Sequence, residues 1–500
     1  MDAILGLDRR ALDRARASRD PRFDGKFFIA VTSTRIYCRP VCPVPSPKVA
    51  NIRYYATAAS AAEAGYRPCL RCRPEAAPGT PAWLGTSAVV RRALQLIHEG
   101  ALDESSVDAL AARVGIGPRH LHRLFVQHVG ASPVVVAQTR RLHFAKRLLD
   151  ETSLRMTEIA LASGFGSLRR FNHAFQATYR RAPRDLRRQR RGERAADGGD
   201  VVLRLAYRPP YDWEQVRDFL ATRAVPGVER VDDRGYARTV LTPSGHATVC
   251  VRTLPSEHAL ELRVRGAAPA ALFHLSSTAR RAFDLAADPA RIALALRGDP
   301  RLGPLVARRP GLRIPGAWDP FECAVRAVLG QQVSVAAGRT LAARLVTRVG
   351  HEIDGGTDGL THLFPSPAAL AAANLDGLGL PGARVRALQA LAVAVARGVL
   401  DFSAPAEEVV GRLEALPGFG AWTAQYVALR GLGEPDAFPA ADLVLRRAAA
   451  ENEAPLTAHA LEARAEAWRP WRGYAVLHLW RAAGDVAPPR PQGRRRGLRS

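Results

Sequence analysis

Cys38-Arg-Pro-Val-Cys42 and Cys69-Leu-Arg-Cys72 are two close cysteine pairs that decide how the N-terminal part of the chain folds. Two such pairs separated by a short segment are typical of a tetrahedral zinc–thiolate site. Each pair can reach one ion from a tight turn, and segment 43–68 must then fold back to bring the pairs together. We therefore expect a single Zn²⁺ bound by all four cysteines. The spacing leaves two interpretations open: a purely structural site, or one in which zinc activates a thiolate for chemistry.

The chain is strongly basic, with 72 Lys and Arg residues against 47 Asp and Glu residues and a formal net charge of +25. Because only Lys26, Lys48 and Lys146 are lysines, a compositional bias toward arginine could explain part of the count. The excess still predicts a polyanionic partner, and nucleic acid is the commonest one. The 500 residues are too many for one hydrophobic core, so we expect several domains.

The sequence does not predict a secreted or membrane protein. Cys250 and Cys323 stand apart from the other cysteines, so a disulfide framework is not expected. Residues 1–22 are charged throughout, unlike a signal peptide, and no uncharged apolar stretch is long enough to cross a membrane. We therefore expect a cytoplasmic protein with no membrane partner.

Proline, glycine and polar residues punctuate the chain at 73–81 and 189–200, where we expect flexible linkers. Helical periodicity fills the interval between them. Past the second linker, apolar and polar residues alternate, which predicts strands. These strands are expected over 201–207, 247–253 and 260–264. A helical pattern with glycine breaks then covers 319–480, and the basic tail 489–500 is expected to be disordered.

The amino-acid sequence around the two cysteine pairs closely resembles the N-terminal domain of the Ada protein family. The segments that carry the resemblance are 24–31, 34–42, 51–55 and 61–74. In that family the site repairs DNA methyl phosphotriesters, and the resemblance places the methyl-accepting nucleophile at Cys38. It leaves the other three cysteines as permanent zinc ligands. Because methylation removes one negative charge from the cluster, it should strengthen binding to DNA phosphates.

A helix, a glycine turn and a second helix follow one another twice between the linkers. In the first unit a serine-capped helix over 106–114 leads through the turn 115–117 into a helix over 119–128, which a proline precedes. The second unit repeats this order over 157–163, 164–166 and 167–179. A helix over 134–149 joins the units, and the whole resembles an AraC-type DNA-binding domain.

The second helix of each unit would enter the major groove of DNA. Arginine and asparagine side chains are suited to base edges, so polar residues of these helices are the candidate DNA contacts. They are Arg119, His120, His122 and Arg123 in the first unit, and Arg169, Arg170, Asn172 and His173 in the second. The alternative is that these residues form the solvated faces of an ordinary helical bundle.

The sharpest motif of the C-terminal half is Leu416-Pro-Gly-Phe-Gly-Ala-Trp-Thr-Ala-Gln-Tyr-Val-Ala-Leu-Arg430. Its proline and glycines predict a short hairpin between helices, where Gly418 and Gly420 would let the backbone approach a DNA phosphate. The motif resembles the helix-hairpin-helix of a DNA-repair glycosylase superfamily. Asp442, in the segment 436–445, stands at the position of that superfamily's catalytic aspartate. The alternative for Asp442 is a helix cap or a surface charge.

Residues from about 201 to 485 resemble the AlkA family of 3-methyladenine DNA glycosylases. The stretches that carry this likeness are 207–213, 219–224, 310–316, 321–334 and 468–480. The resemblance implies that Asp442 stabilises the oxocarbenium charge that develops as an alkylated purine leaves its sugar. It also implies that Trp422, Tyr426 and Trp480 stack on a base flipped out of the duplex; the alternative for each ring is plain core packing.

The sequence differs from the families that it resembles at positions that limit the reactions we expect. Trp422 stands where bifunctional glycosylases have a Schiff-base lysine, so we expect a monofunctional enzyme that leaves an abasic site. No iron–sulfur loop follows Trp480, so the glycosylase is expected to need no cofactor. Gln332 replaces the apolar wedge of AlkA proteins, and Leu443 replaces an aromatic residue, which leaves the flipping geometry and the substrate range open. The Pro-Cys-His-Arg motif of Ada methyltransferases is absent.

Together these features predict a multidomain, mainly α protein. The expected parts are a zinc-bound α+β module (1–76), a double helix-turn-helix domain (84–190), a small α/β subdomain (201–285), a helix-hairpin-helix glycosylase domain (286–487) and a basic tail (488–500). The expected function is that of a methylation-activated transcription regulator that also excises alkylated bases. Its expected partners are promoter and damaged double-stranded DNA and RNA polymerase, in a bacterial nucleoid. The alternative is a DNA-binding regulator whose glycosylase half is catalytically idle.

Overall fold

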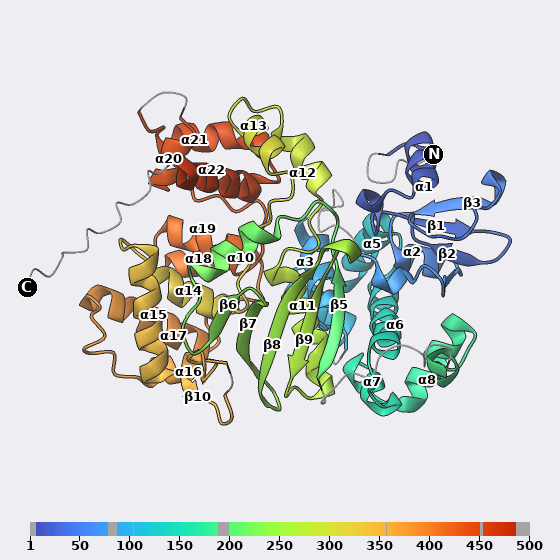
Figure 1. The fold of residues 1–500 in the computed structure, drawn as a ribbon, viewed down its shortest axis with the longest axis horizontal. Coiled ribbons are helices and arrows are strands. Elements are labelled where there is room, and N and C mark those ends of the chain that lie inside the picture. Colours follow the sequence, from blue (N-terminus) through green and yellow to red (C-terminus); the bar gives the residue numbers. More distant parts are fainter. Residues whose placement is uncertain are drawn as a thin grey trace, which may run out of the picture.

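The computed structural model describes residues 7–78, 88–103, 105–188, 200–356, 358–450 and 454–486. Figure 1 shows a central twisted sheet, with the zinc module and the helix-turn-helix domain on one side and the remaining helices on the other. The predicted tail 489–500 lies outside the described residues, as does nearly all of the predicted linker 189–200. Among the helices within the described ranges, none is both long enough and apolar enough to cross a bilayer.

The zinc module is a small four-stranded sheet with a helix on each side. Its elements are α1 (Arg9–Ser18), β1 (Phe28–Val31), β2 (Ile36–Cys38), β3 (Ile52–Tyr55), α2 (Ala58–Glu63) and β4 (Arg67–Pro68), with strand order β3-β1-β2-β4. Successive side chains of a strand point to opposite faces. Ile29 therefore packs with Leu12 of α1, whereas Phe28 and Ala30 pack with Tyr37 near α2. Two small apolar clusters hold the module together.

The two helix-turn-helix units are confirmed. Their helices are α3 (Ala88–His98), α4 (Val107–Arg113), α5 (Pro118–Val129), α6 (Pro133–Glu151), α7 (Met156–Ala162), α8 (Leu168–Tyr179) and α9 (Pro183–Arg188). The Ser106 side chain accepts a hydrogen bond from the Ala109 backbone N–H at 3.2 Å, as expected of a helix cap. Gly115 and Gly164 adopt φ of 73° and 78° in the turns, a conformation that favours glycine.

The central sheet has five antiparallel strands in the order β5-β9-β8-β7-β6. They are β5 (Val201–Ala206), β6 (Glu229–Asp232), β7 (Gly235–Thr242), β8 (Gly245–Leu254) and β9 (Ala259–Arg265), and α10 (Trp213–Ala221) and α11 (Leu272–Ala282) accompany them. The alternation of polar and apolar residues predicts β5, β8 and β9 but not β6 and β7. Strand β7 is buried on both faces from Gly235 to Val240, so it shows no alternation of polar and apolar residues.

The remaining helices form two lobes that share α19. They are α12 (Pro289–Leu296), α13 (Leu302–Arg308), α14 (Pro320–Leu329), α15 (Val335–Val349), α16 (Pro367–Ala372), α17 (Gly382–Ala396), α18 (Ala406–Glu414), α19 (Ala421–Arg430), α20 (Leu443–Ala448), α21 (Ala458–Ala465) and α22 (Arg472–Val486). One apolar core contains Ala424 and Val427 of α19, and the other contains Ala428 and Leu429. Helix α19 is thus fixed from both sides.

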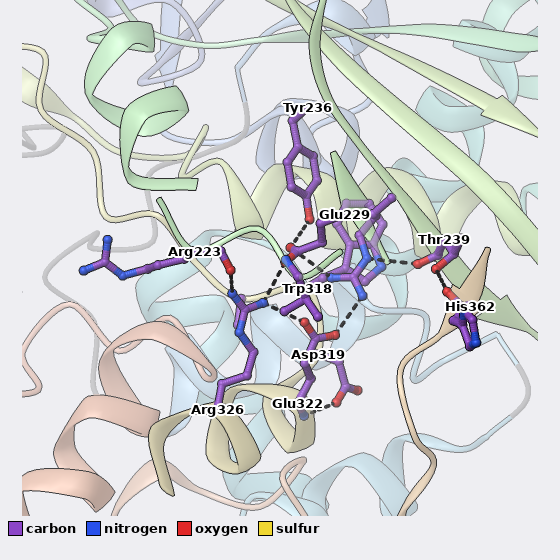
Figure 2. A network of polar contacts seen from close by, with 12 residues as sticks. Arg223, Glu229, Tyr236, Thr239, Trp318, Asp319, Glu322, Arg326 and His362 are labelled. Carbon is purple, nitrogen blue, oxygen red and sulfur yellow. Dashed lines mark hydrogen bonds and ion pairs between the residues drawn. The ribbon is translucent and has the colours of Figure 1, made fainter. Parts of the chain in front are cut away.

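A buried network of charges joins the sheet to α14 (Figure 2). Arg238 of β7 pairs with Glu322 of α14 at 2.7 Å, and Arg326 of α14 pairs with Glu229 of β6 at 2.9 Å. The Tyr236 hydroxyl donates to Glu229 at 2.7 Å. Each of these two arginines and two glutamates therefore has an opposite partner, which is what burial of ions requires. The network fixes α14, and with it the loop that follows.

The prediction of a flexible linker over 73–81 is wrong for residues 73–78. Arg73 pairs with Glu75 at 3.3 Å and with Asp150 of α6 at 2.9 Å. Lys146, also on α6, lies 2.6 Å from Asp150 and 3.6 Å from the buried Glu75. These polar residues looked solvated in sequence because their partners are distant along the chain. Residues 79–81 lie outside the described part.

The two halves of the protein are in direct contact, an arrangement that the predicted flexible linkers did not suggest. Lys26 of the zinc module forms a buried ion pair with Asp288 at 2.7 Å. The fully buried Arg208 donates to the backbone carbonyls of Asp24 and Ala286. One continuous apolar core also includes Phe171 and Phe175 of α8 together with strands of the central sheet. The helix-turn-helix domain and the sheet therefore fold against each other.

Candidate functional sites

The four predicted zinc ligands lie together, with all their Sγ atoms within 4.8 Å of one another. Strands β2 and β4 pair in parallel, with Tyr37 opposite Pro68, so that Cys38 and Cys69 follow at the same end of the sheet. The Cys69 N–H donates to the Tyr37 carbonyl at 2.9 Å and extends this pairing. Sequence spacing could suggest that the pairs meet; the parallel strands supply the reason.

The cysteine cluster fits a zinc ion. Zn–S bonds of about 2.3 Å in a tetrahedron place sulfurs about 3.8 Å apart, within the limit observed here. The hydrogen bond with Cys38 lowers the pKa of Cys42 to about 7. Hydrogen bonds with Cys38, Cys42 and Cys69 raise the pKa of Cys72. Four thiolates repel one another, and a dication at their centre removes this conflict. Within the described ranges, no second group of three or more metal-binding side chains is found.

The cluster has an open side and a closed side. Cys38 and Cys42 are half-exposed, whereas Cys69 and Cys72 are buried. The Arg39 backbone N–H donates to the Cys72 sulfur at 3.3 Å, and its guanidinium is held by Asp24 with Nε to Oδ1 at 2.8 Å. The guanidinium also donates from Nη1 to the Cys72 carbonyl at 3.0 Å, so the Arg39–Asp24 ion pair fixes the backbone at the closed side of the cluster.

The predicted base-reading residues all lie on the surface. In α5, the buried face consists of Leu121, Phe125 and Val129. The exposed positions include Arg119, His120, His122 and Arg123. In α8, Phe171, Phe175 and Tyr179 are buried. Arg169, Arg170, Asn172 and His173 are exposed. Both helices thus leave a polar face free in the same register, as a pair of groove-reading helices requires.

The hairpin between α18 and α19 has the geometry that its glycines predict. Gly418 is exposed at φ 81°, and a Cβ there would lie 2.8 Å from the Ala387 Cβ. Gly420 is the N-cap of α19, whose first N–H groups have no acceptor within the helix and can bind an anion. Gln331 donates to the Gly418 carbonyl at 2.9 Å. Its neighbour Gln332 is exposed at φ 54°, beside the hairpin.

Asp442 is both a helix cap and the centre of an aromatic cluster. Its Oδ1 accepts a hydrogen bond from the Leu445 backbone N–H at 2.8 Å, which caps α20. The indole N–H of Trp422 donates to Oδ2 at 2.7 Å, and that of Trp480 donates to Oδ1 at 3.3 Å. The cap is thus one of the carboxylate's three hydrogen bonds. The other two bring the predicted pocket residues to it.

The three predicted pocket aromatics lie together. The rings of Trp422 and Tyr426 stack with centroids 5.3 Å apart and planes 16° apart, and Tyr426 lies 6.3 Å from Trp480. A flat ring cannot enter between Trp422 and Tyr426 at this separation, so only the outer faces of the cluster are open to stacking. Three elements bring these side chains together: α19, the N-terminus of α20 and α22.

Sequence reasoning missed two arginines behind this cluster. Arg430 donates from Nη1 to the Tyr426 hydroxyl at 2.6 Å, and its Cζ lies 4.3 Å from the Phe219 ring centroid. Arg223 lies 3.9 Å from the same ring. The spacing of four residues between Tyr426 and Arg430 on one helix could have indicated the first contact. No local signal indicates Arg223, because it comes from the α/β subdomain.

These features define a class: a DNA-binding repair protein with a cysteine metal cluster, paired helix-turn-helix units and a helix-hairpin-helix lobe. Four family models match the chain in the same order. They are "Metal binding domain of Ada" (11–75), "Helix-turn-helix domain" (110–189), "AlkA N-terminal domain" (202–319) and "HhH-GPD superfamily base excision DNA repair protein" (325–473). The first model and the four converging cysteines support zinc as the bound metal.

Known proteins that are similar to this chain match the same parts of it as the family models do. The "Probable bifunctional transcriptional activator/DNA repair enzyme AlkA" of Mycobacterium tuberculosis (strain H37Rv) is 43% identical over 472 residues, covering 93% of this chain and 95% of that protein. "DNA-3-methyladenine glycosylase 2" of Escherichia coli K12 is 38% identical over 286 residues, 56% of this chain and 97% of the relative. E. coli "Bifunctional transcriptional activator/DNA repair enzyme Ada" is 36% identical over 152 residues, 30% of this chain and 40% of the relative.

The chain belongs to the family of bifunctional Ada–AlkA fusion proteins that the M. tuberculosis relative represents. Among solved structures, the 3-methyladenine DNA glycosylase from Archaeoglobus fulgidus matches with a TM-score of 0.51 at 23% identity. That match covers 57% of this chain and 99% of the other, and it shows the shared fold of the C-terminal half.

Proposed function

We propose that the protein is a bifunctional alkylation-response protein: a zinc–thiolate acceptor of methyl groups from DNA phosphotriesters, which acts as a transcription regulator, fused to a glycosylase that excises alkylated purines. The observation that carries the repair half is Asp442, held by the indole N–H groups of Trp422 and Trp480. The names of the AlkA-type relatives support the same activity. We divide the chain at the expected boundaries, 1–76, 84–190, 201–285, 286–487 and 488–500.

In the glycosylase half, the Asp442 carboxylate is the catalytic residue. As the bond between sugar and alkylated purine breaks, positive charge grows on the sugar, and a fixed carboxylate stabilises it. Three N–H donors orient this carboxylate, so little reorganisation is needed. Water then adds to the sugar and leaves an abasic site, since Trp422 takes the place of a Schiff-base lysine. The glycosylase half uses no cofactor.

Binding of damaged DNA uses the hairpin and the loop beside it. The N–H groups at Gly418 and Gly420 would take a backbone phosphate. Gln332 is exposed in a left-handed conformation that is unusual for a residue other than glycine, and such positions concentrate at functional sites. We assign Gln332 the role of filling the gap that the flipped base leaves. The aromatic cluster of Trp422, Tyr426 and Trp480 takes the base itself.

In the sensor half, Cys38 is the methyl acceptor and one zinc ion is bound. Zinc, when bound, keeps the four sulfurs ionised. The Cys38 sulfur attacks the methyl carbon; the S–C bond forms, the C–O bond breaks, and the phosphotriester becomes a phosphodiester anion. The exposure of Cys38 supports this assignment, because Cys69 and Cys72 are buried. Cys42 is also half-exposed, and the family resemblance decides between the two.

In the regulatory role, the exposed faces of α5 and α8 would read a promoter and position RNA polymerase. Arg119, Arg123, Arg169, Arg170 and Asn172 are the assigned DNA contacts. Loss of one negative charge from the cysteine cluster on methylation strengthens the attraction to DNA. Mass spectrometry of the Cys38 peptide after incubation with methylphosphotriester DNA tests the sensor. A peptide without added methyl would leave zinc a purely structural role.

Base release from alkylated duplex DNA tests the repair half against the alternative of an idle glycosylase lobe. Wild type should release the base, and Asp442→Asn should not, although asparagine still caps a helix. Asp319→Asn is the matched control, because Asp319 caps α14 with an acceptor distance of 2.8 Å and touches none of the pocket aromatics. No release by wild type would favour the alternative, whereas equal release by Asp442→Asn would contradict the catalytic role of Asp442.

A further inference from the structure

A cavity of about 710 Å³ lies where the zinc module and the helix-turn-helix domain meet the glycosylase half. Residues of helices α3, α6 and α11 line it. This volume falls within the range of small-molecule pockets, about 300–1,000 Å³. The cysteine cluster, the hairpin and the aromatic cluster do not line it. The cavity is therefore separate from every site described so far.

Arginines with unused N–H groups line this cavity. Arg140 and Arg147 lie two turns apart on one face of α6, with His143 and Phe144 between them, and Arg280 comes from α11. Arg140 is 9% exposed and Arg147 8%. Within the described residues, the buried Nε and Nη1 of Arg140, Nε of Arg147 and Nη2 of Arg280 have no hydrogen-bond acceptor. Buried donors of this kind are costly unless something accepts from them.

The arginine charges converge and are only partly neutralised: Arg140 pairs with Asp103 and Arg147 lies 3.9 Å from Glu151, whereas no ion pair of Arg280 is found in the part of the chain that the structure describes. Burial, followed by the charges of Arg147 and Arg208, lowers the pKa of Arg280 to about 9. The pKa of His98, which borders the same cavity, falls to about 4 through enclosure in the protein and the charges of Arg140 and Arg280. Each guanidinium is thus close enough to disfavour another positive charge.

Three of the carboxylates that line the cavity already pair with other cations. Glu75 pairs with Arg73, Asp288 lies 2.7 Å from Lys26, and Glu434 lies 3.1 Å from Arg91. Asp103 binds Arg140, but through one terminal nitrogen only. The positive charge that remains calls for an anion from outside the chain.

The walls between the arginines are aromatic. Phe144 and Phe273 meet edge to face with centroids 5.0 Å apart, and the Arg140 guanidinium lies 4.1 Å from the Phe273 ring centroid. We propose that this cavity binds a small organic phosphate with an aromatic body, of the size of a nucleoside monophosphate. Arg140, Arg147 and Arg280 take the phosphate, and Phe144 and Phe273 contact the body. Because the ligand touches α6 and α11 together, it couples the regulatory half to the repair half.

Calorimetric titration of the full chain with adenosine monophosphate, adenosine and inorganic phosphate tests the proposal, which does not depend on the proposed function. The nucleotide should bind, inorganic phosphate more weakly, and adenosine not at all. Arg140→Gln should raise the Kd for the nucleotide by roughly tenfold or more, the loss expected for a charge-assisted hydrogen bond.

Arg141→Gln is the matched control, because Arg141 also binds Asp103, at 2.7 Å, but does not line the cavity. It should change the Kd by less than about twofold, as expected away from the ligand. Arg280→Gln provides a second variant that leaves Asp103 untouched and should weaken binding as Arg140→Gln does. The proposal is overturned if the nucleotide does not bind, if inorganic phosphate binds equally well, or if Arg140→Gln and Arg280→Gln both retain wild-type affinity.

Discussion

Replacing Trp422 with phenylalanine removes one indole N–H from Asp442 but leaves an aromatic ring against Tyr426. The Trp422 Nε1 is 2.7 Å from Oδ2, whereas the Trp480 Nε1 is 3.3 Å from Oδ1. Without the shorter bond, the carboxylate is free to rotate. A rotation that moves its charge from about 4 to about 5 Å from the sugar cation weakens their attraction by about 0.8 kcal/mol at an effective dielectric constant of about 20. Base release should then slow by about fourfold.

The loss of a hydrogen bond to a charged group, about 1.5–3 kcal/mol, sets an upper limit of roughly a hundredfold. The assay is single-turnover excision of an alkylated purine from duplex DNA, with enzyme in excess. Trp480→Phe, which removes the longer bond, should have the smaller effect. If Trp422→Phe folds normally and its rate constant stays within about twofold of wild type, the idea that this bond orients Asp442 is wrong.

Three further predictions concern the metal, the DNA and the pH. Cys69→Ser replaces a buried sulfur, so it should release zinc and lower the thermal midpoint; unchanged metal content and midpoint would contradict its role as a ligand. If Arg123 contacts a phosphate, Arg123→Ala should weaken binding to all DNA sequences and reduce the slope of log K against log[salt] by about one. If it contacts a base, the variant should lose specificity at one position of the DNA site. Unaltered affinity would place Arg123 outside the interface. Burial lowers the pKa of His478 to about 4. In the unfolded chain this histidine takes up a proton near pH 6.5, so the stability of the fold should fall as the pH drops from about 6.5 to 4. The His478→Gln variant should lose less stability over this range than wild type. An equal loss of stability at pH 5 in wild type and in His478→Gln would show that this histidine does not cause the effect.

The helical parts of the fold could be predicted from sequence because their signals are local. Ser106, the turn glycines and the buried 121–125–129 spacing are all read within one or two helical turns. Strand β7 could not be predicted, because both of its faces are buried and its sequence does not alternate. Segment 73–78 was misjudged because the partners of Arg73 and Glu75 lie on α6, far along the chain.

The candidate sites divide in the same way. Motif spacing and family resemblance pointed to the four cysteines and to Asp442 with its aromatics, and the structure brings each set together. Arg223 and the arginines of the cavity could not be found, because the aromatic cluster and the cavity are each surrounded by residues of more than one domain. Contacts between domains leave no periodic trace in a sequence.

Helix α19 belongs to both lobes, and it carries Trp422 and Tyr426. Loosening of either lobe would therefore disturb the rings that we propose stack on the damaged base, even where Asp442 itself stays in place. Base release should therefore be lost in one step on heating, as soon as either lobe melts. A protease cut in either lobe should likewise abolish excision, so the enzyme is not expected to work as a half-folded fragment.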